Sequence, residues 1–123
     1  MKQPSANASE TDFQRFVTDA LDLAGWKWFH DSDSRRNKAG LPDIIAAHPD
    51  RGILFAELKT QKGRLRPEQA SWLSHLALAV VPGDDEEPWG GRRRVFVKVW
   101  RPADWQDVLE VTGVSRMIEG EAA

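Results

Sequence analysis

The fold of this chain is decided by residues 40–69, which read GLPDIIAAHPDRGILFAELKTQKGRLRPEQ. Two short apolar runs, residues 44–47 and 53–56, are separated by residues 48–52, which include Pro, Asp and Gly. Apolar runs joined by a short segment of turn-forming residues predict a β-hairpin. Because apolar residues occupy both faces of the two strands, we expect a central hairpin that is covered on both sides.

The hairpin predicts that two carboxylates lie together at its open end. With a turn centred near Asp50, the numbers of paired residues sum to about one hundred, which places Asp43 opposite Glu57. Directly opposed residues on one face have Cβ atoms roughly 5 Å apart. Lys59, two residues after Glu57, projects from the same face. Two acids and one base are therefore expected to meet at the end of an otherwise apolar hairpin.

Two neighbouring carboxylates in an apolar setting need a positive charge. Burial without a partner disfavours the ionised form, and adjacent carboxylates resist ionising together. A divalent cation removes both costs, and carboxylate oxygens suit magnesium or manganese, which also accept substrate phosphate. The pattern also permits a plainer interpretation, in which Asp43 begins a strand beside a surface ion pair between Glu57 and Lys59.

The order and spacing of these residues resemble the PD-(D/E)xK nuclease superfamily, and within it the VRR-NUC (virus-type replication-repair nuclease) domain. The resemblance is carried by Gly40-Leu41-Pro42-Asp43, Glu57-Leu58-Lys59, Pro67-Glu68-Gln69, the helix that Glu10 opens and the run Trp100–Trp105. It covers residues 9–110. It implies an α/β fold with a PD-(D/E)xK nuclease core, in which helices flank a mixed central sheet of about four strands.

The resemblance and the chemistry of the residues together imply a role for each group at the charged end. Asp43 and Glu57 would bind Mg²⁺ or Mn²⁺ with the backbone carbonyl of Leu58, and Glu10 would assist through a water molecule or a second ion. Lys59 would orient the attacking water and stabilise developing charge, and Gln69 would hold Lys59 or the phosphate. The predicted catalytic residues are Glu10, Asp43, Glu57, Lys59 and Gln69.

Two of these residues also have simpler explanations. An acid in the first turn of a helix, such as Glu10, is favoured by the helix dipole alone. Gln69 lies in the first turn of another predicted helix, where an amide can simply face solvent. Both interpretations stay open on the sequence.

The remaining patterns predict the element order helix, three strands, helix, strand, helix. The helices are expected from Ser9 to Ala24, from Pro67 onward and over residues 104–109, and the outer strands over 26–30 and 95–100. In the second helix one apolar face is formed by Trp72, Leu73, Leu76, Ala77 and Val80. We expect a single domain over residues 9–112 with an inserted loop at 82–94, preceded by a disordered tail at 1–8 and followed by a C-terminal tail at 113–123.

Composition limits the class of protein. The chain has 123 residues, six Trp and no Cys, which predicts one packed domain without disulfides or thiolate metal sites. It shows no signal peptide and no apolar run of membrane-spanning length. We therefore expect a cytoplasmic protein of a bacterium or a phage-infected cell, with no membrane partner.

The formal net charge of −2 conceals an uneven distribution. From Lys27 to Arg66 the chain has nine basic residues and five acids, so a basic face for a nucleic-acid backbone is possible although the total is slightly negative. Such charges are also common on ordinary solvated surfaces. The candidate DNA-binding residues are Arg35, Arg36, Lys38, Lys62, Arg64 and Arg66.

These observations lead to the hypothesis of a divalent-metal-dependent, structure-selective DNA endonuclease. Branched DNA such as a Holliday junction as substrate, and a homodimer as the active form, are implied by the resemblance alone. The alternatives are a catalytically silent DNA-binding module on the same fold, a restriction-type or RNA-directed nuclease, and a small interaction protein whose charges all lie on its surface.

Overall fold

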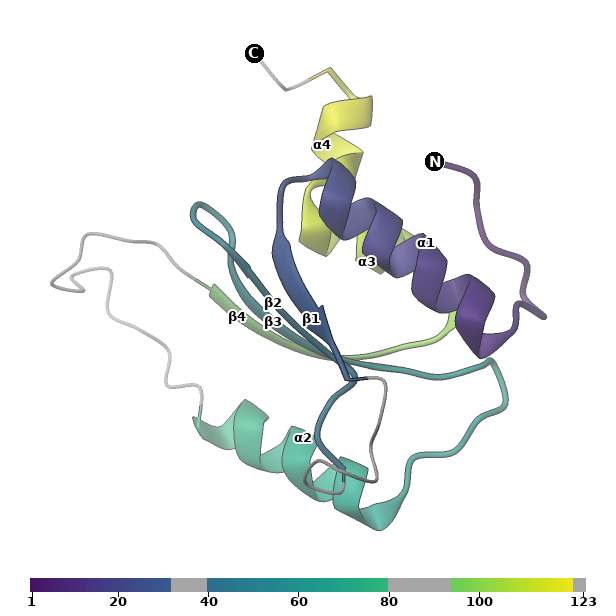
Figure 1. Cartoon of the computed structure of the whole chain (residues 1–123), viewed down its shortest axis with the longest axis vertical. Helices are drawn as coiled ribbons and strands as arrows, with labels where there is room; N and C mark the ends of the chain where they lie inside the picture. Colours follow the sequence, from purple (N-terminus) through teal and green to yellow (C-terminus); the bar gives the residue numbers. More distant parts are fainter. Residues whose placement is uncertain (32–39, 80–93, 121–123) are drawn as a thin grey trace, which may run out of the picture.

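Helices flank a four-stranded mixed sheet (Figure 1). The computed structural model describes residues 1–31, 40–79 and 94–120. The elements are α1 (Glu10–Leu23), β1 (Lys27–His30), β2 (Ile44–His48), β3 (Gly52–Leu58), α2 (Pro67–Ala79), β4 (Arg94–Trp100), the 3₁₀ helix η1 (Pro102–Asp104), α3 (Trp105–Thr112) and α4 (Val114–Ile118). The predicted α/β class and the predicted order through α3 are confirmed.

The sheet has the order β1-β2-β3-β4. β1 and β2, and likewise β2 and β3, are antiparallel, whereas β3 and β4 are parallel and joined through α2. In the central hairpin Ile44 pairs with Ala56 and His48 with Gly52, so the paired numbers sum to one hundred as predicted. This register brings the start of β2 beside the end of β3.

One face of the sheet carries the core. The Ser9 side chain caps α1 by accepting a hydrogen bond from the backbone N–H of Asp12, and α1 then buries an apolar stripe against the sheet and α3. The buried core includes Phe13, Val17 and Leu21 of α1, Ile44, Leu54 and Trp100 of the strands, and Val108 of α3. The core therefore joins β2, β3 and β4 into one rigid support.

The other face of the sheet is more open than predicted. Phe29 is 57% exposed, Ile53 43% and Val95 36%, although α2 lies on this side (Figure 1). α2 contacts β4 and has one buried residue, Leu73, while Leu78 is 85% exposed. The expectation that the hairpin is covered on both sides is thus wrong within the described ranges, because α2 packs over only part of this face.

The two ends of the chain differ in part from the predicted tails. Residues 1–8 form no helix or strand, but Ala8 packs against the core. At the other end the chain continues past residue 112 into α4, and Val114 is fully buried. α4 was missed because its five residues are too few to show an apolar period. Within the described residues, no helix has the length and apolarity needed to cross a membrane.

Candidate active site

Asp43 and Glu57 lie at the open end of the central hairpin. Asp43 directly precedes the first residue of β2, and Glu57 is the last but one residue of β3. The Oδ2 atom of Asp43 accepts a hydrogen bond of 2.9 Å from the backbone N–H of Leu58. This bond continues the contact between the two strands past the Ile44–Ala56 pair. It holds the Asp43 carboxylate against the residue that follows Glu57, as the predicted register requires.

Glu57 is an acid inside the protein. Its residue is 1% exposed. The pKa of Glu57 is raised to about 7, first by burial and then by the nearby Asp43 carboxylate, while the Lys59 ammonium acts in the opposite direction. The Oε2 atom is buried and has no hydrogen-bond partner. A buried carboxylate oxygen without a partner is costly, so this atom marks a place where a proton or a cation is needed.

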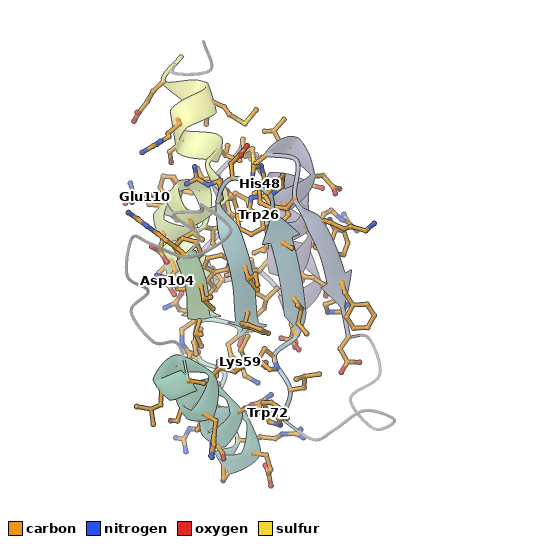
Figure 2. All side chains as sticks on the ribbon, turned by 90° about the vertical axis from the view of Figure 1, so that its left-hand side faces the viewer. Trp26, His48, Lys59, Trp72, Asp104 and Glu110 are labelled. Atoms are coloured by element: carbon orange, nitrogen blue, oxygen red, sulfur yellow. The ribbon has the colours of Figure 1, made fainter. Side chains whose placement is uncertain are left out.

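Lys59 extends the site on the same face. Its Nζ lies 3.5 Å from Oε1 of Glu57, and its backbone N–H donates to the carbonyl oxygen of Trp100 over 2.9 Å. The backbone bond prolongs the parallel pairing of β3 and β4 by one residue. Lys59 is therefore held by its main chain while its side chain reaches Glu57. In Figure 2 Lys59 lies at the end of the sheet that faces α2, and His48 lies at the opposite end.

Gln69 links the site to the start of α2. Its Nε2 donates to Oε1 of Glu57 over 2.8 Å, and its Oε1 accepts from the backbone N–H of Arg66 over 2.9 Å. One partner supplies an acceptor and the other a donor, so the two contacts together fix the orientation of the amide. The solvent-facing alternative for Gln69 is thus excluded in this structure.

Gly40 explains how the Gly-Leu-Pro-Asp segment comes so close to α2. Its φ angle is +87°, and an added Cβ would lie 2.5 Å from the backbone carbonyl of Glu68 and 2.8 Å from the backbone nitrogen of Gln69. Only a residue without a side chain fits there. The segment before Asp43 therefore crosses the first turn of α2, which carries Gln69.

One residue at the site was missed by the sequence reasoning. Nη1 of Arg101 donates to the backbone carbonyls of Thr60, Gln61 and Gly63, in the loop that follows Lys59. The run Trp100–Trp105 was noted only as a resemblance. A usable signal was present, since Arg101 directly follows the strand that had to pair with the strand of Glu57.

The residues present fit a divalent cation at Asp43 and Glu57. Both side chains provide hard oxygen donors at one end of the sheet. The unpartnered Oε2 and the raised pKa of Glu57 indicate that a positive charge would stabilise the ionised carboxylate there. In the described part of the chain no group of three or more His, Cys, Asp or Glu side chains could hold a metal. A metal site here would depend on two carboxylates, a backbone oxygen and water.

The other predicted site residues are exposed or lie outside the described residues. Glu10 is exposed as the first residue of α1, and among the described residues no hydrogen bond or ion pair joins it to the other four predicted catalytic residues. Lys62, Arg64 and Arg66 are exposed in the loop between β3 and α2. Arg35, Arg36 and Lys38, and residues 82–93 of the predicted inserted loop, lie outside the described residues.

Comparison with known proteins agrees with this geometry. The family model of the VRR-NUC domain matches residues 5–82, more than half of the chain. A solved structure described as a VRR_NUC domain is similar, with a TM-score of 0.58, 17% sequence identity, and coverage of 84% of this chain and 97% of that one. No curated protein matches. The chain belongs to the VRR-NUC domain family, a family of nucleases.

Proposed function

We propose that this protein is a divalent-metal-dependent DNA endonuclease whose reaction centre is formed by Asp43, Glu57, Lys59 and Gln69. Membership of a nuclease family supports DNA as the substrate class. The observation that supports the centre most strongly is the buried, unpartnered Oε2 of Glu57, next to Asp43 and within reach of Lys59. A structural ion pair does not need a second, partly buried carboxylate beside it.

The carboxylates of Asp43 and Glu57 would hold Mg²⁺ or Mn²⁺, with the backbone carbonyl of Leu58 as a further ligand. The bound ion supplies Lewis acidity at the phosphate and lowers the pKa of water. Hydrogen bonds from Leu58 and Gln69 already fix one oxygen of each carboxylate. The chain thereby pre-orients both acids, which lowers the cost of ordering them when the ion binds.

In the proposed reaction Lys59 acts on the water and the phosphate, and Gln69 acts on the metal ligand Glu57. The Lys59 ammonium orients the attacking water and stabilises negative charge that develops on the phosphate. Gln69 keeps Oε1 of Glu57 engaged, so that Oε2 is the oxygen left for the ion. Glu10 is proposed to assist through water once DNA and metal are bound.

The basic residues beside the centre fit the backbone of DNA. We propose that Lys62, Arg64 and Arg66 contact phosphates, and that Arg35, Arg36 and Lys38 do the same. Such contacts give affinity that falls with salt and reads little sequence. We further propose branched DNA such as a Holliday junction as the substrate, cut by a homodimer, because paired cuts in a four-way junction match two-fold symmetry.

The proposal is tested by cleavage of four-way, flap and linear duplex DNA with Mn²⁺, Mg²⁺ or a chelator. We expect cleavage with either ion, a preference for branched DNA, and none with the chelator. Binding of DNA without cleavage under every ion condition would favour the catalytically silent alternative. Cleavage of linear duplex at defined sequences would favour a restriction-type nuclease.

A further inference from the structure

Arg101 makes an unusual set of contacts for a charged side chain. Its Nη1 donates to the carbonyl oxygens of Thr60 over 2.8 Å, Gln61 over 3.4 Å and Gly63 over 2.5 Å. Within the described ranges its guanidinium has no carboxylate partner. Charge-assisted hydrogen bonds are roughly twice as strong as neutral ones, so this one side chain holds three backbone carbonyls within the single turn after Lys59.

The anchoring of the loop is reinforced from the same side. The backbone N–H of Ala103 donates to the side-chain Oε1 of Gln61 over 3.1 Å. The backbone of Arg101 is itself held, because its N–H donates to the Asp104 carboxylate over 2.8 Å. The end of β4 and the start of η1 therefore act as a fixed template for residues 60–63.

The clamped loop lies directly against Lys59. An added Cβ at Gly63 would lie 3.5 Å from Cδ of Lys59 and 3.0 Å from Oγ1 of Thr60. The Gly63 backbone thus packs beside the aliphatic stem of Lys59, and Arg101 binds the carbonyl of that same glycine. Release of this carbonyl would free the surface that limits where the Lys59 ammonium can go.

We propose that Arg101 is a positioning residue that acts through the Thr60–Gly63 turn to hold the Lys59 ammonium beside Glu57. The inference rests on the proposed nuclease function, and Arg101 touches neither substrate nor metal in it. Displacement of the Lys59 ammonium would slow the chemical step more than it would weaken substrate binding. The effect on kcat is therefore expected to exceed the effect on KM.

The chain offers a matched control in Arg51. Its Nε and Nη2 donate to the carbonyls of Val111 and Glu110 over 3.1 and 3.0 Å, so it too binds backbone carbonyls through its guanidinium. Arg51 directly precedes β3 and Lys59 directly follows it, so the two are roughly 26 Å apart at about 3.3 Å per residue. Loss of Arg51 removes comparable contacts without touching the Lys59 loop.

The test compares Arg101→Met, Arg101→Lys and Arg51→Met in steady-state cleavage of branched DNA, thermal unfolding and hydrogen exchange. We expect Arg101→Met to lower kcat about tenfold to a hundredfold and to change KM by less than about threefold. Arg101→Lys should recover part of kcat, since the three carbonyls converge on one nitrogen. Hydrogen exchange in residues 59–66 should be faster in Arg101→Met than in the parent protein. Arg51→Met should lower Tm but leave kcat unchanged.

Two results would overturn the role of Arg101. The first is a folded Arg101→Met protein in which hydrogen exchange of residues 59–66 is unchanged, which would show that Arg101 does not clamp the loop, whether or not the parent protein cleaves DNA. The second is an equal loss of kcat in Arg51→Met at an equal loss of Tm, which reduces the effect to general stability. If the parent protein cleaves no DNA with any divalent ion, the proposed function fails and the catalytic part of this inference fails with it. The exchange data would still decide whether the clamp exists.

Discussion

Gln69 donates a hydrogen bond of 2.8 Å to Oε1 of Glu57, across the junction between the start of α2 and the end of β3. The same amide accepts from the backbone N–H of Arg66, as an acceptor at the third helical position does in a capping box. One side chain therefore begins the helix and orients a buried acid. Because Gln69 makes both contacts, substitutions of Gln69 can distinguish an effect on helix formation from an effect on the orientation of Glu57.

Replacing Gln69 by Glu keeps an acceptor for Arg66 but removes the donor to Glu57 and adds a third acid. We expect near-normal helix formation, a Glu57 pKa raised further by the added charge, and a large loss of cleavage. Gln69→Ala should lose both contacts and also about 1 kcal/mol of stability. Thermal unfolding and cleavage rates of the two variants check this. Equal cleavage by Gln69→Glu and the parent would contradict the role of the amide, and Glu68→Gln in the same turn serves as control.

The raised pKa of Glu57 predicts how stability depends on pH without metal. The pKa of Glu57 in the folded protein is about 7 and lies above its pKa in the unfolded chain. The stability that Glu57 contributes is therefore fully present at pH values below the unfolded pKa. It is lost as pH rises through about 7, and amounts to on the order of 3 kcal/mol. Unfolding free energies of the parent and Glu57→Gln between pH 5 and about 8 should diverge accordingly, with the parent declining relative to the variant. A constant difference across this range would show that Glu57 does not titrate there.

Lys59→Met should separate metal binding from catalysis. The ammonium lies 3.5 Å from Glu57 but is a cation and cannot be a ligand, so its removal should leave binding of Mn²⁺ intact or strengthen it. Cleavage should fall by at least about a hundredfold if Lys59 supplies charge stabilisation. Calorimetric titration with Mn²⁺ and a cleavage assay on the same preparation provide the comparison. A variant that still cleaves at the parent rate would remove Lys59 from the mechanism.

The exposed basic loop predicts a specific change in salt dependence. Each phosphate contact contributes about 0.9 to the slope of log affinity against log salt. Single substitutions Lys62→Gln, Arg64→Gln and Arg66→Gln should therefore each lower the slope by roughly one and weaken all DNA forms alike. Arg15→Gln, an exposed change on α1, should leave the slope unchanged. If the loop variants behave like this control, the DNA backbone binds elsewhere.

Much of the site could be predicted because a hairpin is a local structure. The turn around Asp50 fixes the register, and the register then fixes that Asp43 comes next to Glu57 and that Lys59 shares its face. The apolar period of α1 and the proline at the start of α2 marked both helices for equally local reasons. The approach of Gln69 to the site was expected from the resemblance, not from spacing, and its observed partner is Glu57 rather than the expected Lys59 or phosphate.

The remainder depends on contacts between distant parts of the chain. The Arg101 side chain reaches Thr60 across 41 positions, and no periodicity encodes which carbonyls it meets. The face around Ile53 is open because α2 packs over only part of the sheet. The composition of the strands does not determine where α2 packs. The exposed position of Glu10 at the head of α1 follows from the cap that Ser9 provides.

Binding of Mn²⁺ to Asp43→Asn and Glu57→Gln, measured by electron paramagnetic resonance alongside cleavage of four-way DNA, tests the central claim most directly. If the two carboxylates hold the ion that the reaction needs, the parent protein binds Mn²⁺ and cleaves. Each variant, still folded by circular dichroism, loses both activities together. Undiminished Mn²⁺ binding and cleavage in either folded variant would contradict the account.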